Sequence, residues 1–209
     1  RAKQYYVGGV HAANRYHSCL GAPVYVDRME GCRLMNISEQ GFSELNRQVV
    51  IIAGAPGAGK TELSGMIART TGYPRLEKDL LAGRSGRTRA YRTLMDLAAD
   101  IASNGSSVIL DAGFLPELSV PGWVQRNEQG FGLLGARLHV VLVEAAQGVR
   151  EDRMRLRGIA RDAARLSEPQ HQPVPSRKPS CTVNNAAGIF ELMEQAQTVV
   201  SGLGLRRDT

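Results

Sequence analysis

Cysteine, lysine and aromatic residues are all scarce in this chain of 209 residues. The three cysteines, Cys19, Cys32 and Cys181, lie far apart and lack the spacing of metal ligands. Their distribution favours free thiols in a reducing compartment, so we expect a cytoplasmic protein. A Cys19–Cys32 disulfide is the alternative that the sequence leaves open.

Long apolar runs are also missing, and none is long enough to cross a bilayer. The chain is 43% hydrophobic, which is enough for one domain with its own core. We therefore expect a soluble protein without a membrane partner. Because the chain begins at Arg1 and not at Met, we expect a fragment or a processed form, which leaves open a removed targeting peptide.

The net charge of +6 comes mostly from arginine, with 22 arginines against 4 lysines. The planar fork of arginine fits phosphate oxygens better than the point charge of lysine. The densest group consists of Arg150, Arg153, Arg155, Arg157, Arg161 and Arg165. Acidic residues are interleaved with it at helical spacing, so a solvated helix face is the alternative to phosphate binding.

Residues 49–64 join an apolar, strand-like run to a glycine-rich turn and then to a helix-compatible segment. Within them, Gly54-x-x-x-x-Gly59-Lys60-Thr61 has the complete Walker A spacing. Glycines let the backbone curl until successive N–H groups point at phosphate oxygens, and the following helix adds its positive end. Lys60 can reach the β- and γ-phosphates, and the Thr61 hydroxyl is placed to hold Mg²⁺. The predicted nucleotide-binding residues here are Gly54, Ala55, Pro56, Gly57, Ala58, Gly59, Lys60, Thr61 and Glu62.

Beyond residue 48, strand-length apolar runs alternate with helix-length segments. The expected strands cover residues 49–53, 74–78, 107–111, 137–144 and 181–183. The expected helices cover about 59–71, 87–103, part of 116–134, a segment from about 147, and 186–202. This alternation predicts an α/β protein: a three-layer P-loop fold around a mostly parallel five-stranded sheet with right-handed crossovers.

The remaining segments carry weaker signals. Residues 1–47 contain no motif and are expected to form an N-terminal extension to a domain of residues 48–209. Residues 167–180 contain four prolines and are expected to form an irregular loop. Asn184 or Asn185 is expected to cap the last helix.

Two carboxylates follow predicted strands, where ligands of open α/β sheets bind. Asp111 closes the apolar run Ser107–Leu110, which has the form of a Walker B strand, so we expect it near Mg²⁺ or its waters. Asp79 follows the second strand and is a candidate for acid–base chemistry. For both residues the alternative is a helix cap.

With these motifs the chain resembles the small P-loop kinases of the adenylate-kinase-like type, over about residues 48–203. The resemblance is to the family of predicted kinases that includes polynucleotide 5′-kinase, chloramphenicol phosphotransferase and zeta-toxin kinases. It rests on residues 54–61, on Lys78-Asp79, and on Tyr91 followed by the segment 104–112 that ends in Asp-Ala. Residues 153–162 look like the arginine-bearing lid of this family.

The resemblance implies roles for individual residues. Asp79 matches the residue that receives the acceptor hydroxyl, with Asp111 also on the substrate side. Arg84 stands in for a basic residue of the acceptor site, although the family often has Asp-x-x-Arg and Arg84 lies five residues on. Arg153 and Arg157 match lid positions that contact the base and the transferring phosphoryl group, and Arg157 or Arg161 would be the arginine finger. The lid is expected over about residues 153–177.

We therefore expect a kinase that uses ATP (or GTP) and Mg²⁺, with Lys60, Asp79 and Arg157 as its catalytic residues. The expected acceptor is a hydroxyl of a small molecule, such as a nucleoside, a sugar nucleotide or an antibiotic. A polynucleotide 5′-hydroxyl is one alternative, which the positive charge supports and the aromatic content of 5% disfavours. A slowly hydrolysing nucleotide switch is another. Asp79 in an open cleft favours transfer, whereas a buried, capping Asp79 favours the switch.

Overall fold

Five strands form one sheet in the order β4-β5-β3-β6-β7, in a computed structural model that describes residues 26–30, 33–36, 47–85, 87–158, 173–186 and 188–207. The strands are β3 (Arg47–Gly54), β4 (Arg75–Glu77), β5 (Val108–Asp111), β6 (Ala136–Glu144) and β7 (Cys181–Asn184). Every neighbouring pair in this sheet is parallel. The predicted mostly parallel sheet is therefore confirmed, and it is parallel throughout.

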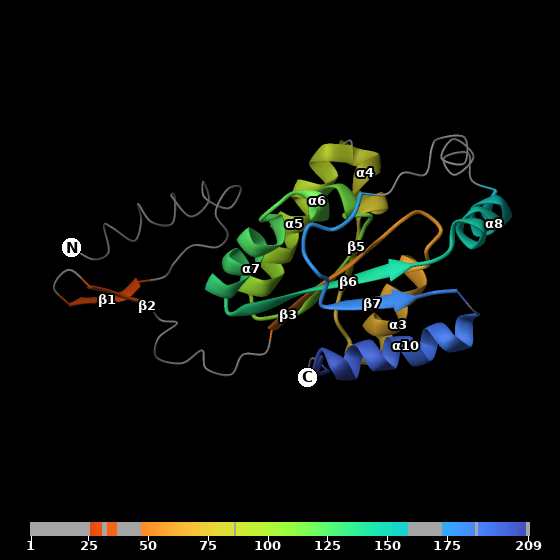
Figure 1. The fold of residues 1–209 in the computed structure, drawn as a ribbon. Coiled ribbons are helices and arrows are strands. Elements are labelled where there is room, and N and C mark those ends of the chain that lie inside the picture. The colour runs from red at the N-terminus through yellow and green to blue at the C-terminus, as the bar shows by residue number, and fades with distance from the viewer. Residues whose placement is uncertain are drawn as a thin grey trace.

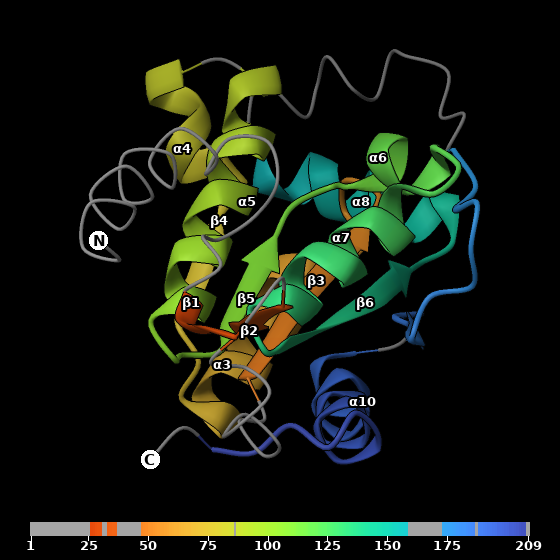
Figure 2. The same ribbon diagram turned by 90° about the vertical axis from the view of Figure 1, so that its left-hand side faces the viewer.

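Helices cover both faces of the sheet (Figures 1 and 2). They are α3 (Lys60–Thr71), α5 (Arg87–Ser103), α6 (Leu115–Ser119), α7 (Trp123–Leu133) and α10 (Ile189–Gly202). The central strand β3 is buried on both sides, as its unbroken apolar run predicts. Val49 and Ile51 pack with α5, α6 and α7, whereas Val50 and Ile52 pack with α3 and α10. The three-layer fold is confirmed.

Two further helices, α4 (Lys78–Ser85) and α8 (Gln147–Arg157), directly follow the carboxyl ends of β4 and β6. Figure 1 shows α8 beyond the tip of the β6 arrow. Helix α8 begins at the predicted residue, but α4 was not predicted. The two helices bring the residues of the predicted acceptor and lid regions to the edge of the sheet where the glycine-rich turn lies.

The N-terminal region contains a short antiparallel hairpin of β1 (Val26–Glu30) and β2 (Arg33–Asn36). This hairpin has its own two-stranded sheet, separate from the five-stranded one. The limits of the predicted extension at residues 1–47 and of the domain at 48–209 stay predictions.

The last helix begins later than predicted. Helix α10 starts at Ile189 with Gly188 as its N-cap and has no side-chain cap, so the predicted capping by Asn184 or Asn185 is wrong. The Asn185 side chain instead donates a hydrogen bond to the Ala58 carbonyl oxygen. Over the part of the chain that the structure describes, no helix is both long and apolar enough to cross a membrane.

Candidate functional site

The glycine-rich turn after β3 has the backbone that its glycines predict. Gly54, Gly57 and Gly59 all have positive φ angles, of 147°, 79° and 100°. A Cβ atom on Gly54 would lie 2.3 Å from the Val143 carbonyl oxygen, and one on Gly57 would lie 2.6 Å from the Arg150 carbonyl oxygen. The turn is therefore pressed against β6 and α8, and only glycine fits at these points.

Lys60 and Thr61 begin helix α3 directly after this turn. The Lys60 ammonium donates a hydrogen bond to the Ala55 carbonyl oxygen at 2.8 Å, so it arches back over the turn. The first four N–H groups of a helix have no partner inside the helix, and α3 directs its own toward the turn. The turn and the helix start together provide the amide donors and the positive charge that phosphate requires.

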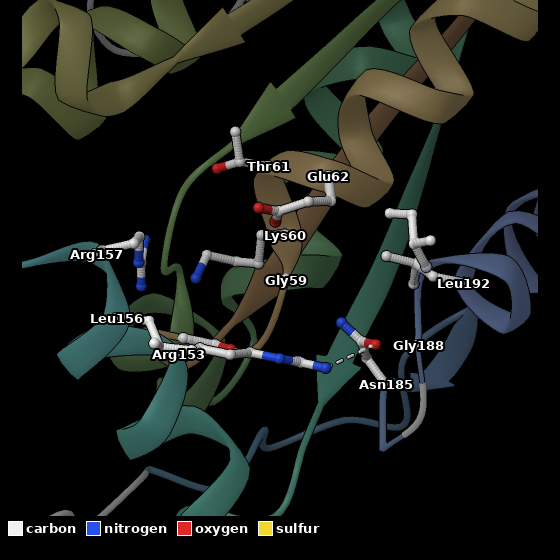
Figure 3. A pocket seen from close by; sticks show the side chains of 12 residues that line it. Gly59, Lys60, Thr61, Glu62, Arg153, Leu156, Arg157, Asn185, Gly188 and Leu192 are labelled. Carbon is white, nitrogen blue, oxygen red and sulfur yellow. Dashed lines mark hydrogen bonds between the residues drawn. The ribbon is translucent and has the colours of Figure 1, made fainter.

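A pocket of about 420 Å³ opens beside this turn (Figure 3). Its walls come from the turn and the start of α3, from α8, and from the segment that leads into α10. The lining residues are Gly57, Gly59, Lys60, Thr61, Glu62, Arg153, Leu156, Arg157, Asn185, Gly188, Ile189 and Leu192. Leu156, Ile189 and Leu192 supply apolar surface on two sides of the pocket, and Lys60, Arg153 and Arg157 supply positive charge.

Asp111 lies at the carboxyl end of β5, next to the start of α3. It is only 6% exposed, and its Oδ2 accepts a hydrogen bond from Ser64 Oγ at 2.9 Å. Burial raises the pKa of the Asp111 carboxyl, while the hydroxyl of Ser64, the charge of Lys60 and the hydroxyl of Thr61 offset part of that shift. The carboxylate and the Thr61 hydroxyl are oxygen donors of the kind that Mg²⁺ prefers, so the predicted pair fits this ion chemically.

Arg75 connects β4 to the same helix start, which the sequence did not reveal. Its Nη1 donates to the Thr61 carbonyl oxygen at 2.8 Å and to Ser64 Oγ at 3.2 Å. Its Nη2 pairs with Glu77. Ser64 is therefore contacted by Arg75 on one side and by Asp111 on the other, which fixes the first turn of α3 against two neighbouring strands.

On the other side of the sheet, Asp79 is exposed in the first turn of α4. Beside it, Lys78 Nζ lies 4.6 Å from the ring centre of Tyr91 and 3.5 Å from its hydroxyl. The Phe114 N–H donates to the same hydroxyl at 3.4 Å, and Phe114 has a left-handed φ of 52°. Such strain in a non-glycine residue often marks a functional site.

This group adjoins the glycine-rich turn through the segment that follows β5. The Gly113 carbonyl oxygen accepts a hydrogen bond from the Gly54 N–H at 3.0 Å, and a Cβ atom on Gly113 would lie 3.1 Å from the Tyr91 hydroxyl. Burial raises the pKa of Tyr91, and the nearby carboxylate of Glu117 adds to the shift. Tyr91 is therefore a neutral hydroxyl group between the predicted acceptor side and the turn.

The arginines of α8 divide between two environments. Arg153 and Arg157 line the pocket, whereas Arg155 is 61% exposed and pairs with Glu151 and Asp152. Arg150 is buried and donates from Nε to the Ala145 carbonyl oxygen at 3.1 Å. The solvated helix face therefore describes Arg155, whereas phosphate binding by Arg153 and Arg157 stays a prediction.

Two predicted residues cannot be placed at this site. Arg161 lies outside the described residues, as does most of the predicted lid between residues 158 and 173. Arg84 lies in α4, but its side chain is outside the description. The roles given to both stay predictions.

Asn185 was not predicted to belong to the site. Its Nδ2 donates to the Ala58 carbonyl oxygen at 2.8 Å, and its Oδ1 accepts from Arg153 Nη2 at 3.3 Å. Arg153 Nη1 lies 3.5 Å from the carbonyl oxygens of both Gly57 and Ala58. The only sequence signal was an asparagine after a short strand, which we interpreted as a helix cap.

Comparison with known proteins agrees with this geometry. Residues 49–174 match the family model described as an AAA domain. No curated protein matches the chain.

Two solved structures illustrate the shared fold. The APS kinase CysC of Mycobacterium tuberculosis, in complex with AMPPNP and APS, has 19% identity and a TM-score of 0.59, covering 76% of this chain and 98% of its own. A gluconokinase from Sinorhizobium meliloti 1021 has 19% identity and a TM-score of 0.50, covering 75% of this chain and 91% of its own. At these identities the likeness shows the fold, which is that of small P-loop kinases.

Proposed function

The chain belongs to this AAA domain family, and from that premise we propose that it is an ATP-dependent kinase. It would move the γ-phosphoryl group of ATP to a hydroxyl of a small molecule, such as a nucleoside, a sugar nucleotide or an antibiotic-like compound. One observation carries the proposal. At the carboxyl ends of adjacent parallel strands, the glycine-rich turn and Lys60 follow β3, Asp111 ends β5, and an exposed Asp79 follows β4.

Phosphoryl transfer needs little covalent help, so its catalysis consists of positioning and charge neutralisation. The amide groups of residues 54–62 and the Lys60 ammonium would bind the phosphates. Arg157, on the pocket wall, would meet the γ-phosphoryl oxygens as charge develops on them. Thr61 and Asp111 would hold Mg²⁺, which when bound neutralises charge on the β- and γ-oxygens.

Asp79 would orient the acceptor hydroxyl and take its proton. The notion that Asp79 is a buried helix cap, which favoured a nucleotide switch, is not supported, because the side chain is exposed. Lys78 and the neutral Tyr91 hydroxyl beside it can donate hydrogen bonds to further oxygens of the acceptor. A small, oxygen-rich acceptor suits these donors.

The apolar side chains on the pocket wall suit the nucleotide base. Leu156 and Ile189 are 87% and 50% exposed, so each has surface to cover. A base placed between α8 and the start of α10 would direct its phosphates to the glycine-rich turn. The APS kinase that shares this fold holds AMPPNP and APS together, which supports a nucleotide beside a small acceptor. Since ATP is the donor and cysteines are few, we infer a cytoplasmic reaction.

The experiment that tests this function measures ADP release from ATP and Mg²⁺ with a panel of acceptors. The panel contains nucleosides, sugars, sugar nucleotides, aminoglycoside-type antibiotics and an oligonucleotide with a 5′-hydroxyl. We expect one small-molecule class to accelerate ADP release, and Lys60→Ala to abolish the acceleration while the protein stays folded. Stimulation by the oligonucleotide alone would favour the polynucleotide kinase. Slow hydrolysis unaffected by every acceptor would favour the switch.

Asp79→Asn is the variant that separates transfer from binding. Losing a general base typically lowers kcat by roughly 10²–10⁴, and we expect a loss in that range with ATP affinity nearly unchanged. Circular dichroism and the unfolding midpoint provide the check on folding. If Asp79→Asn changes only the unfolding midpoint, Asp79 has no part in the reaction.

A further inference from the structure

We propose that Asn185, which lies outside the Walker A motif but lines the same pocket, orients the phosphate-binding turn. Its side chain fixes the peptide group between Ala58 and Gly59, so that the Gly59 N–H faces the phosphates. Asn185 follows β7, 127 residues beyond Ala58, and belongs to no part of the Walker A motif. The inference rests on the nucleotide-binding part of the proposed function and not on the identity of the acceptor.

Both ends of Asn185 are fixed. Its main-chain N–H donates to the Glu144 carbonyl oxygen at 2.7 Å, which ties it to the end of β6. Its side chain donates to Ala58 and accepts from Arg153, and the residue is only 5% exposed. Figure 3 shows the Asn185 amide and the Arg153 guanidinium joined by this hydrogen bond across the pocket. Asn185 can therefore act as a rigid support.

The geometry of the peptide group then determines the direction of the Gly59 N–H. In a trans peptide the C=O and N–H groups point in opposite directions. Because the Ala58 carbonyl points to Asn185, the Gly59 N–H of the same peptide points away from Asn185. Amide groups that bind phosphate must converge in this way, with their carbonyls on the outside of the turn.

Because Gly59 is flexible, the Ala58–Gly59 peptide group needs a side chain to hold it in place. Gly59 has a φ of 100°, and a Cβ atom there would lie 2.1 Å from Asn185 Nδ2. Glycine allows this φ angle and leaves room for Asn185. The same backbone freedom also lets the peptide group rotate. Without Asn185, the energy of phosphate binding would have to offset the ordering of this peptide, so affinity for phosphate would fall.

The test compares Asn185→Ala with its neighbour Asn184→Ala, which removes an exposed amide of the same kind. Calorimetry measures the affinity of each variant of the 209-residue chain for ADP with Mg²⁺ and for adenosine, which has the base but no phosphate. We expect Asn185→Ala to weaken ADP binding about tenfold, the scale of one hydrogen bond to an oriented group. Adenosine binding should change less than twofold, and Asn184→Ala should bind both ligands as the native protein does.

Asn185→Leu provides a second, uncharged variant of similar size if the alanine variant does not fold. It loses the donor to Ala58 and adds no negative charge near the phosphates, so we expect the same selective loss of ADP affinity. If ADP and adenosine affinity fall equally, or if ADP affinity is unchanged, Asn185 does not orient the Gly59 N–H toward the phosphates. A native protein that binds no ADP would overturn this role and the proposed function together. Selective loss in a protein that phosphorylates no acceptor would refute the kinase alone.

Discussion

At the scale of single residues, the candidate site relies on side chains that bind backbone carbonyls. Lys60 contacts Ala55, Arg75 contacts Thr61, and Asn185 contacts Ala58. Each contact gives a backbone carbonyl of the turn or of the helix start a side-chain partner. Lys60 has three N–H donors, so its bond to Ala55 leaves donors for phosphate oxygens.

Asp111→Asn should change the dependence of the reaction on Mg²⁺. The amide keeps the size of the carboxyl group and can still bond to Ser64, but it removes the negative charge next to Thr61. We expect the Mg²⁺ concentration for half-maximal rate to rise about tenfold or more, as expected when a charged ligand group is lost. Rate measurements across a Mg²⁺ titration at saturating ATP provide the test. An unchanged titration curve with lower thermal stability would make Asp111 a structural residue.

Arg157→Ala should lower kcat more than it raises KM for ATP. Arg157 lines the pocket, where its guanidinium would meet phosphoryl oxygens mainly in the transition state. The matched control on the same helix is Arg155→Ala. Arg155 forms exposed pairs with Glu151 and Asp152, and such pairs contribute little. Steady-state kinetics on both variants checks the difference, and equal effects would mean that Arg157 also belongs to an ordinary solvated face.

At the scale of elements, the sequence predicted best the helices and strands whose apolar residues are buried in the core. The strand expected at residues 49–53 is β3, and the helix expected at 87–103 is α5 with the same limits. Both have apolar positions that pack against the other layer. Of the α4 side chains that the structure describes, Leu81 packs against the core but the neighbouring Leu80 is 72% exposed, so periodicity gave little signal for this helix.

The residues of the site also fall into two groups, those that local motifs predict and those that only the fold reveals. The turn and the carboxylate at the end of β5 follow from local motifs, because neighbouring residues create the required backbone. The contacts of Asn185 and Arg75 join distant parts of the chain, and no local pattern in one sequence reports such contacts. Residue type alone favoured a helix cap for Asn185, and tertiary packing gave it another partner.

A buried histidine between two strands predicts a pH effect on stability. His139 of β6 is 7% exposed, and its Nε2 lies 2.7 Å from Gln48 Oε1 of β3. Burial lowers the pKa of His139 to about 4, with the charge of Arg137 adding to the shift. Between pH 4 and the ordinary pKa of about 6.5, the unfolded chain binds more protons than the folded chain. Stability should therefore fall as pH decreases through this range.

The loss should reach up to about 3 kcal/mol, from roughly 1.4 kcal/mol for each unit of pKa shift. Urea unfolding at several pH values compares the native protein with His139→Gln. All other titratable groups are the same in the two proteins, so the difference between their stability curves reports His139 alone. Glutamine cannot be protonated, so its stability curve should lack this part of the slope. Parallel curves for the two proteins would show that His139 has the same pKa in the folded and unfolded states.

At the scale of the whole molecule, the pocket joins segments far apart in the sequence. The turn after β3 lies near the start of the five-stranded domain, whereas Asn185 and Ile189 lie close to its end. Figure 1 shows α10 alongside α3 in the same layer, and Val183 and Leu192 share a buried cluster with Leu63 of α3. A nucleotide in this pocket would therefore connect the two ends of the domain.

This arrangement predicts that nucleotide binding stabilises the domain as one unit. At a free ADP concentration of about 100 times its Kd, linkage gives roughly 2.7 kcal/mol of added stability. Hydrogen exchange should then slow at the start of α10 as well as in α3, because residues of both elements line the pocket. Lys60→Ala should lose both the added stability and the slower exchange, since its ammonium group interacts with ligand charge. Slower exchange confined to residues 54–71 would show that the nucleotide contacts the turn alone and that α10 is not part of its site.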